Sequence, residues 1–318
     1  MKSKMGIAST SYMGVWRPKD TYEFLEHCHA LGAAGIQAGV QGDIAGEATT
    51  RADVARIRNR AEQLGMYVEA MVVMPRGTDT TAFEQALKDA RDVGAVALRA
   101  ACLGSRRYET FATLEAWQQH VKECHQSLAA AVPLLDKYKI PLGLENHKDW
   151  TADEMVAIMK RYSSEYFGVC LDFGNNISLL DDPLEAIEKL APYTVTTHLK
   201  NMAVDTYEEG FLLSEVLMGD GYLDLPHAMR LVQQACPKVR WLLEMITRDP
   251  LKVPCLTDQY WASFPDRNGL ALARTLRFVN THKSALPRIS HLTRDEQLKV
   301  EDQNVIDCLE YAGENLVL

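Results

Sequence analysis

Short apolar runs alternate with longer amphipathic stretches along the chain, which is the pattern of a protein built from β-strands and α-helices in turn. The runs are rich in aliphatic and β-branched residues, and each is four to eight residues long, the usual length of a buried strand. We therefore expect strands at 6–9, 34–38, 66–73, 95–99, 141–145, 167–172, 193–198 and 239–244.

The amphipathic stretches between and after these runs predict helices at 19–32, 49–65, 80–93, 113–138, 152–162, 183–191, 224–235 and 268–282. Thr151 and Glu154 have the spacing of a capping box at the start of one of them. Eight strand–helix units predict an α/β fold, a single (β/α)8 TIM barrel at about 5–282. An open doubly wound sheet is the competing architecture, but no GxGxxG motif follows the first strand and no P-loop sequence occurs.

Two segments exceed the minimal barrel. Residues 201–223 form a long connection after the seventh strand, and we interpret it as either a lid or a decorated loop. Residues 290–312 predict an additional C-terminal helix, which packs on the barrel exterior or on a second subunit. We treat 1–318 as one domain, with a helical extension at about 283–318.

Composition narrows the class of protein. The formal net charge of −9 does not indicate a nucleic-acid partner, and no run of 18 apolar residues predicts a membrane span. The first residues lack the apolar core of a secretory signal. The seven cysteines are scattered and never form a CxxC pair, so we expect reduced, buried thiols and a cytoplasmic location.

Four predicted strands, the fifth to the eighth, each end with a side chain that can bind a metal. In a TIM barrel the carboxyl ends of the strands meet at one face, which is where catalysis takes place. A single acidic residue near a strand end is usually a cap or a rim residue, but four on successive strands predict one divalent metal site. The expected ligands are Glu145, Asp172, His198 and Glu244.

Residues two apart on a strand point to the same face, so we expect His147 and Lys200 beside the metal ligands. His147 is a candidate for proton transfer, and Lys200 for binding an oxyanion or carboxylate; a rim histidine and an exposed lysine are the alternatives. Arg248 is a candidate substrate contact, against the alternative of a salt bridge to Asp249 or a nearby loop. Trp16 is a candidate wall of a sugar pocket, against simple packing.

The sequences Gly143-Leu144-Glu145-Asn146-His147, Cys170-Leu171-Asp172-Phe173-Gly174-Asn175, Thr197-His198-Leu199-Lys200 and Leu243-Glu244-Met245 resemble the sugar phosphate isomerase/epimerase family of xylose-isomerase-like TIM barrels. The resemblance covers most of the chain, from Gly6 to about Asn280. It implies that the same four residues bind one divalent metal, Mn²⁺ first, with Mg²⁺, Co²⁺ or Zn²⁺ as alternatives. This chain departs from many relatives in having Asn201 where they have an aspartate.

The resemblance implies an isomerase or epimerase of a sugar or keto-sugar. In the family's mechanism the metal polarises a carbonyl, and a carboxylate such as Glu145 or Glu244 removes the neighbouring proton to give an enediolate. The alternative is a lyase or hydratase that uses the same intermediate to cleave 3-keto-glycosides or dehydrate inososes. We expect a homo-oligomer, with a small partner subunit if the enzyme is a keto-glycoside lyase. A metal-free sugar-binding barrel is a third hypothesis.

Overall fold

The structure is a computed structural model that describes residues 4–16, 18–40 and 51–318. Its centre is a sheet of eight parallel strands in the order β10-β1-β2-β3-β4-β5-β6-β7. Leu199, just beyond β7, and Leu243, the last residue of β10, form a parallel bridge, which joins the two edges of the sheet into a barrel. The strands are β1 Gly6–Ala8, β2 Gly35–Gly39, β3 Tyr67–Met71, β4 Leu98–Ala100, β5 Leu142–Glu145, β6 Phe167–Asp172, β7 Thr194–His198 and β10 Leu242–Leu243.

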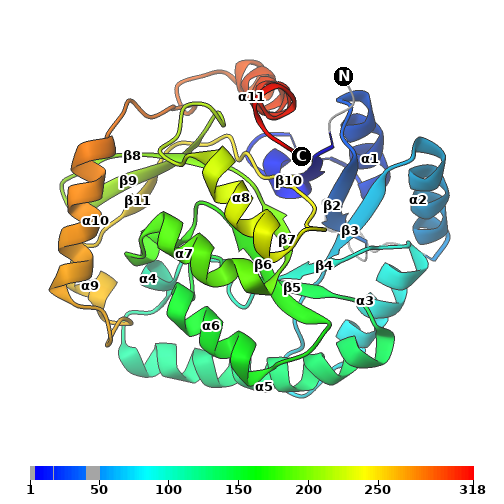
Figure 1. The fold of residues 1–318 in the computed structure, drawn as a ribbon, viewed down its shortest axis with the longest axis horizontal. Coiled ribbons are helices and arrows are strands. Elements are labelled where there is room, and N and C mark those ends of the chain that lie inside the picture. The colour runs from blue at the N-terminus through cyan, green and yellow to red at the C-terminus, as the bar shows by residue number, and fades with distance from the viewer. Residues whose placement is uncertain (1–3, 17, 41–50) are drawn as a thin grey trace.

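Helices surround the barrel and follow its strands in turn (Figure 1). The main ones are α1 Thr21–Ala30, α2 Arg51–Leu64, α3 Thr81–Asp92, α5 Leu114–Tyr138, α6 Ala152–Arg161, α7 Pro183–Leu190, α8 Leu225–Ala235 and α10 Gly269–His282. The short ones are η1 Ser9–Tyr12, α4 Arg107–Thr110, η2 Asn176–Leu179, η3 Ala191–Tyr193 and α9 Asp258–Trp261. The TIM-barrel prediction is confirmed, and the predicted capping box of Thr151 and Glu154 starts α6. Residues 49–50 of one predicted helix lie outside the described residues.

The connection after β7 is neither a lid nor a decorated loop. Strands β8 (Asn201–Tyr207) and β9 (Gly210–Val216) form an antiparallel hairpin, and β11 (Leu251–Val253) pairs with β9. Buried and exposed positions alternate only weakly over 201–207 and 210–216. Most of these residues are buried against α10 and the second apolar cluster. This lack of alternation concealed the strands in the sequence.

The predicted C-terminal helix is α11, Arg294–Asn315. It packs on the barrel itself, against η1 and β10. The buried carboxylate of Glu301 accepts hydrogen bonds from the backbone N–H groups of Val15 and Trp16, and Asn304 donates to Thr247 Oγ1 at 2.9 Å. The helix therefore ties together the loops that follow β1 and β10, on the same face of the barrel as the strand ends.

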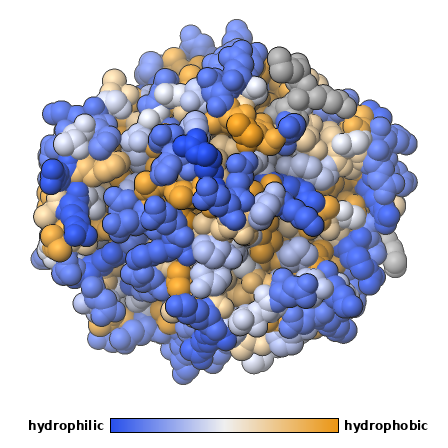
Figure 2. All heavy atoms as spheres, in the orientation of Figure 1, coloured by the Kyte–Doolittle hydropathy of each residue, from blue (hydrophilic) through white to orange (hydrophobic). Residues whose placement is uncertain are grey.

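The apolar core lies inside the barrel and between the barrel and its helices. A second, smaller cluster lies beneath the β8–β9–β11 sheet and α10. Hydrophilic side chains cover most of the face shown in Figure 2, with apolar atoms in small patches between them. Among the described helices, none combines the length and the apolar composition that crossing a membrane requires.

Candidate metal centre

The four predicted ligands come together at one end of the barrel. Glu145, Asp172 and His198 are the last residues of β5, β6 and β7, and Glu244 follows β10 directly. Parallel pairing sets them at one level, with Asp172 opposite His198 in the register of β6 and β7. One ligand atom from each lies within 4.8 Å of the others, and all four side chains are buried. The strand-end prediction therefore located a real cluster, whose metal binding stays a proposal.

His198 has one ring nitrogen held by the barrel and one facing the carboxylates. Its Nε2 lies 2.7 Å from Gln37 Oε1 on β2, so this nitrogen carries the proton and donates it. Gln37 in turn donates to Glu69 Oε2 at 3.0 Å, and Thr196 donates to the same oxygen at 2.6 Å. In a metal-binding histidine, a hydrogen bond from the ring nitrogen that does not bind the metal fixes the tautomer.

The other nitrogen, Nδ1, is buried and has no hydrogen-bond partner among the residues that the structure describes. It lies 3.2 Å from Glu244 Oε1, 3.6 Å from Glu145 Oε1 and 3.8 Å from Asp172 Oδ2. Burial opposes a charged imidazole, but Cys170, Glu244 and Glu145 raise the pKa of His198 well above its ordinary value. One imidazole nitrogen together with three carboxylates is the set of ligands expected of a divalent-ion site.

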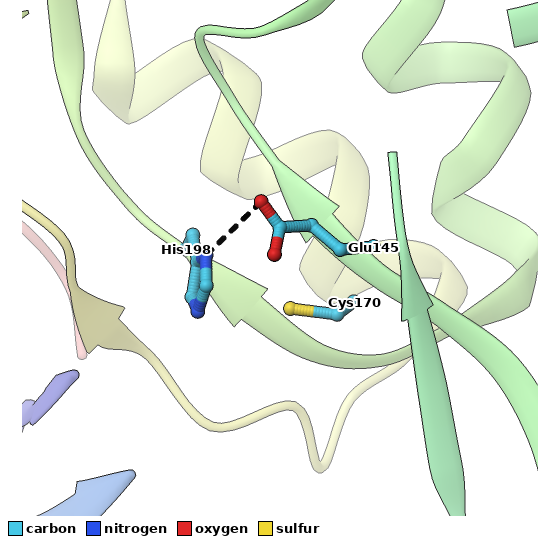
Figure 3. A group of neighbouring side chains, drawn as sticks. All are labelled: Glu145, Cys170 and His198. Atoms are coloured by element: carbon cyan, nitrogen blue, oxygen red, sulfur yellow. Dashed lines mark ion pairs between the residues drawn. The ribbon is translucent and has the colours of Figure 1, made fainter. Parts of the chain in front are cut away.

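Glu145 points from β5 toward His198, with Cys170 of β6 beside them (Figure 3). Its Oε2 accepts a hydrogen bond from Arg99 Nε at 2.5 Å, and Asn175 donates to Oε1 at 3.3 Å. Burial raises the pKa of Glu145, but Arg99 and His198 outweigh it and hold that pKa well below its usual range. Burial raises the pKa of the Cys170 thiol to about 11, so Asp172 is the better fourth ligand.

Asp172 and Glu244 share the buried ammonium of Lys200. Lys200 Nζ lies 2.7 Å from Asp172 Oδ2 and forms an ion pair with Glu244 Oε2. Backbone N–H groups of Gly174 and Asn175 hold the other oxygen of Asp172 at 2.8 and 3.0 Å. Burial raises the pKa of Asp172 to about 6, against the opposing effect of Lys200.

The remaining Glu244 oxygen, Oε1, accepts a hydrogen bond from Thr10 Oγ1 at 2.6 Å. Thr10 lies in η1, directly after β1. Each of the three carboxylates thus has one oxygen facing Nδ1 of His198 and a second partner that sets its orientation. These residues fit a divalent ion that prefers oxygen and imidazole ligands.

The predicted neighbours of the ligands differ in their surroundings. Lys200 is not exposed but fully buried between two ligands, as a group facing the same centre should be. Burial lowers the pKa of His147 to about 3, so its ring is neutral at pH 7. The Nδ1 of His147 is buried and has no hydrogen-bond partner in the described part of the chain. His147 is thus a neutral group with an available nitrogen beside Glu145.

Arg248 forms a bidentate pair with Glu215 of β9, at 2.5 and 3.2 Å, and not with Asp249. The partner is a residue of the hairpin strand, and the role of Arg248 in substrate binding stays a prediction. Trp16 packs its ring edge-on against Tyr12 and tilted against His27 of α1, with centroids 5.0 and 4.5 Å apart. Its contacts are those of a packed side chain, and its role in substrate binding stays a prediction.

Four further charged residues around the centre were missed in the sequence. Arg99 ends the predicted strand 95–99, and Glu215 belongs to the unrecognised hairpin. Glu69 interrupts the apolar run 66–73, which was the available signal for a buried carboxylate. Lys148 follows His147 and donates to Asn175; burial lowers its pKa to about 8.

Residues 25–263 match the sequence profile of a family described as xylose isomerase-like TIM barrel. A curated relative, the 3-oxo-isoapionate decarboxylase of Pectobacterium atrosepticum, is 29% identical over 69% of this chain and 78% of its own. The IOLI protein, solved with a zinc atom, aligns over 98% of both chains with 13% identity and a TM-score of 0.58. The 3-keto-D-glucoside 4-epimerase YcjR of E. coli aligns over 88% of this chain and 100% of its own, with 13% identity and a TM-score of 0.55.

Proposed function

The chain belongs to the xylose isomerase-like TIM barrel family, and we propose that it is a divalent-metal-dependent enzyme that isomerises or epimerises a sugar or keto-sugar. The family and the curated relative indicate a sugar-processing enzyme. The observation that carries the metal is the buried Nδ1 of His198, which faces three carboxylates and has no hydrogen-bond partner in the described part of the chain. A cytoplasmic location and a homo-oligomer remain predictions.

Glu145, Asp172, His198 and Glu244 would hold the ion. When bound, the ion supplies a Lewis acid that polarises a substrate carbonyl and makes the neighbouring C–H more acidic. Mn²⁺ is our first candidate, with Mg²⁺, Co²⁺ and Zn²⁺ as alternatives, because the set offers three carboxylates and one imidazole. The zinc atom in the IOLI structure is consistent with a divalent ion in this fold.

Glu145 and Glu244 are the proposed proton-transfer groups. Glu145 ends β5 and Glu244 follows β10, and these strands lie on either side of β7, which carries His198, so their carboxylates approach a substrate carbon from two sides. Removal of the proton by one and its return by the other gives inversion at that carbon, which is epimerisation. Return to the adjacent carbon gives isomerisation. Lys200, between Asp172 and Glu244, stabilises the negative charge that develops on the substrate oxygen.

A second candidate function is carbon–carbon or carbon–oxygen bond cleavage, which the name of the curated relative favours. Arg99, Lys200 and Arg248 each pair with a buried carboxylate around the centre. The curated relative is named as a decarboxylase of a 3-oxo acid. Elimination from 3-keto-glycosides or inososes uses the same enediolate.

One experiment distinguishes these reactions. The metal-free protein is incubated in D₂O with keto-sugars, 3-keto-glycosides and 3-oxo sugar acids, each with Mn²⁺, Mg²⁺, Co²⁺ or Zn²⁺, and followed by NMR. Epimerisation and isomerisation give deuterium at the exchanged carbon with every substituent retained, elimination gives an unsaturated keto-sugar and a released alcohol or water, and decarboxylation releases CO₂. Asp153→Asn, an acid-to-amide change on an exposed side chain of α6, is the control. Activity that persists unchanged in chelator with every substrate would contradict the proposal.

A further inference from the structure

Two cysteines far apart in the sequence meet beside a cavity outside the metal centre. Cys102 lies in the loop after β4, and Cys124 lies on α5. Both line a cavity of about 460 Å³ together with His120 and Arg76. Cys102 is half-buried and Cys124 is buried, so the cavity is the route by which a small reagent reaches the pair.

The surroundings of Cys124 stabilise its thiolate. The Cys102 and Cys124 thiols interact with each other at the wall of the same cavity, and His120 Nε2 lies 3.3 Å from the Cys124 sulfur. The contact with Cys102 is the largest cause that lowers the pKa of Cys124 to about 6, followed by His120 and opposed by burial and by Glu123. The same contact, burial and Asp149 raise the pKa of Cys102 well above its ordinary value. One thiolate and one thiol therefore lie next to each other at neutral pH.

We propose that Cys102 and Cys124 are a redox-active pair that hydrogen peroxide or an organic hydroperoxide converts into a disulfide. The Cys124 thiolate attacks one peroxide oxygen, the O–O bond breaks, and a Cys124 sulfenic acid and hydroxide form. The Cys102 thiol then attacks that sulfur, and the hydroxyl group leaves as water with the proton of Cys102. The two cysteines lose two electrons in total, and hydrogen peroxide is reduced to one hydroxide, which takes up a proton from solvent, and one molecule of water.

Two observations separate this pair from the other sites that cysteines form. Among the described residues, Cys102 and Cys124 belong to no group of three potential ligands whose atoms lie within 4.8 Å of one another, so a thiolate metal site is disfavoured. Cys236 is also half-buried, but its sulfur contacts only the backbone carbonyls of Ala191 and Thr194 among the described contacts. Burial raises the pKa of Cys236, which therefore lacks both the activating histidine and the second thiol.

The disulfide would tie the loop after β4 to α5. Cys102 lies three residues after Arg99, which holds Glu145 of the proposed metal centre. The disulfide would therefore restrict the backbone segment that follows Arg99. The proposal itself concerns only the thiols and stands whether or not the metal centre has the function proposed above.

The test is peptide mapping of the intact protein by mass spectrometry after peroxide treatment. At pH 7 and before oxidation, Cys124 should react with iodoacetamide roughly tenfold faster than Cys236, because its larger thiolate fraction outweighs its lower nucleophilicity. After peroxide, a Cys102–Cys124 linked peptide should appear while Cys236 stays reduced, and dithiothreitol should reverse the link. Equal oxidation of Cys236, or a dimedone adduct on Cys124 without the link in the wild type, would overturn the proposal.

Two variants test the assigned roles. In Cys102→Ser the sulfenic acid on Cys124 has no thiol to attack it, so dimedone labelling should rise several-fold and the linked peptide should disappear. In His120→Gln the midpoint of the pH dependence of Cys124 alkylation should move upward. An unchanged midpoint would remove His120 from the proposal, and dimedone labelling that does not rise in Cys102→Ser would contradict the order of steps. The wild-type mapping decides the question if a variant does not fold.

Discussion

The two halves of the barrel make different contributions to the candidate metal centre. The half formed by β5, β6, β7 and β10 provides the four proposed ligands, Glu145, Asp172, His198 and Glu244. The half formed by β1 to β4 provides one partner from each strand or the turn after it. These partners, which we call the supporting set, are Thr10, Gln37, Glu69 and Arg99.

The difference teaches how a barrel positions charged side chains without exposing them. Three buried carboxylates next to one another repel, and each loses its hydration. Arg99 compensates Glu145, Thr10 holds one oxygen of Glu244, and Gln37 accepts from Nε2 of His198 so that Nδ1 faces the carboxylates. The ligand half thus determines what the centre binds. The supporting set determines how the ligand side chains are oriented and how they are protonated.

The largest effect is expected in the ligand half. Glu145→Gln and Glu244→Gln keep an oxygen ligand but remove the proposed base, so turnover should fall by on the order of 10²–10⁴-fold while part of the metal binding remains. Steady-state kinetics at saturating Mn²⁺ measures this. Glu188→Gln, on the exposed face of α7, is the matched control. Near-full turnover in both site variants would leave His147 as the better candidate for proton transfer.

Asp172 should behave differently from the two glutamates. Asp172→Asn removes a charged ligand but not the proposed base, so affinity for the metal should fall by about 100-fold or more, since loss of an outer partner alone costs about 10–100-fold. Excess Mn²⁺ should restore part of the turnover. A metal titration followed by activity measures both quantities. Lost activity that does not depend on the Mn²⁺ concentration would give Asp172 a direct role in the reaction.

A substitution in the supporting set should have a smaller effect, confined to metal affinity. Gln37→Leu has a similar volume but cannot accept the Nε2–H of His198, so the ring loses its fixed tautomer and the affinity should fall about tenfold. Calorimetric titration with Mn²⁺ measures it, with Gln85→Leu on the exposed face of α3 as the control. Unchanged affinity with reduced turnover would place Gln37 in the reaction and break the distinction between the two halves.

The smallest effect is expected where α11 holds the loop after β1. Glu301→Gln leaves one oxygen to accept from the N–H groups of Val15 and Trp16, so the protein should lose about 1 kcal/mol of unfolding free energy. Glu310→Gln, an exposed position on the same helix, should change it by a few tenths at most. Urea unfolding followed by circular dichroism measures both. Equal stability of the two variants would show that the contact contributes nothing.

The ligand half was predictable because its side chains are charged and stand at strand ends. Asp172 and His198 follow long apolar runs, and TIM-barrel geometry places such positions together. The eight strands and eight helices of the barrel were predictable from the hydrophobic periodicity, because buried parallel strands have apolar sequences. The xylose isomerase-like family is also shown, and the sequence resemblance already pointed to it.

The supporting set and the hairpin were not predictable from the same signals. Thr10 and Gln37 are neutral polar residues whose importance lies in partners 234 and 161 positions away. Arg248 seemed available for substrate because its partner, Glu215, belongs to β9, a strand whose buried faces hide the alternation of a hairpin. The meeting of Cys102 with Cys124 likewise depends on how α5 lies beside β4, which no spacing of cysteines encodes.

The contacts of α11 also determine the order of events in co-translational folding. The N-terminus leaves the ribosome first, yet the loops that follow the first and the last strand of the barrel are held by Glu301 and Asn304 of α11. All eight strands can therefore emerge and pair before these two loops receive their final partners. The face that carries the metal ligands becomes fully held only after the last helix has been translated. We expect a nascent chain stalled before residue 294 to form the barrel and to remain sensitive to protease in the loop after β1.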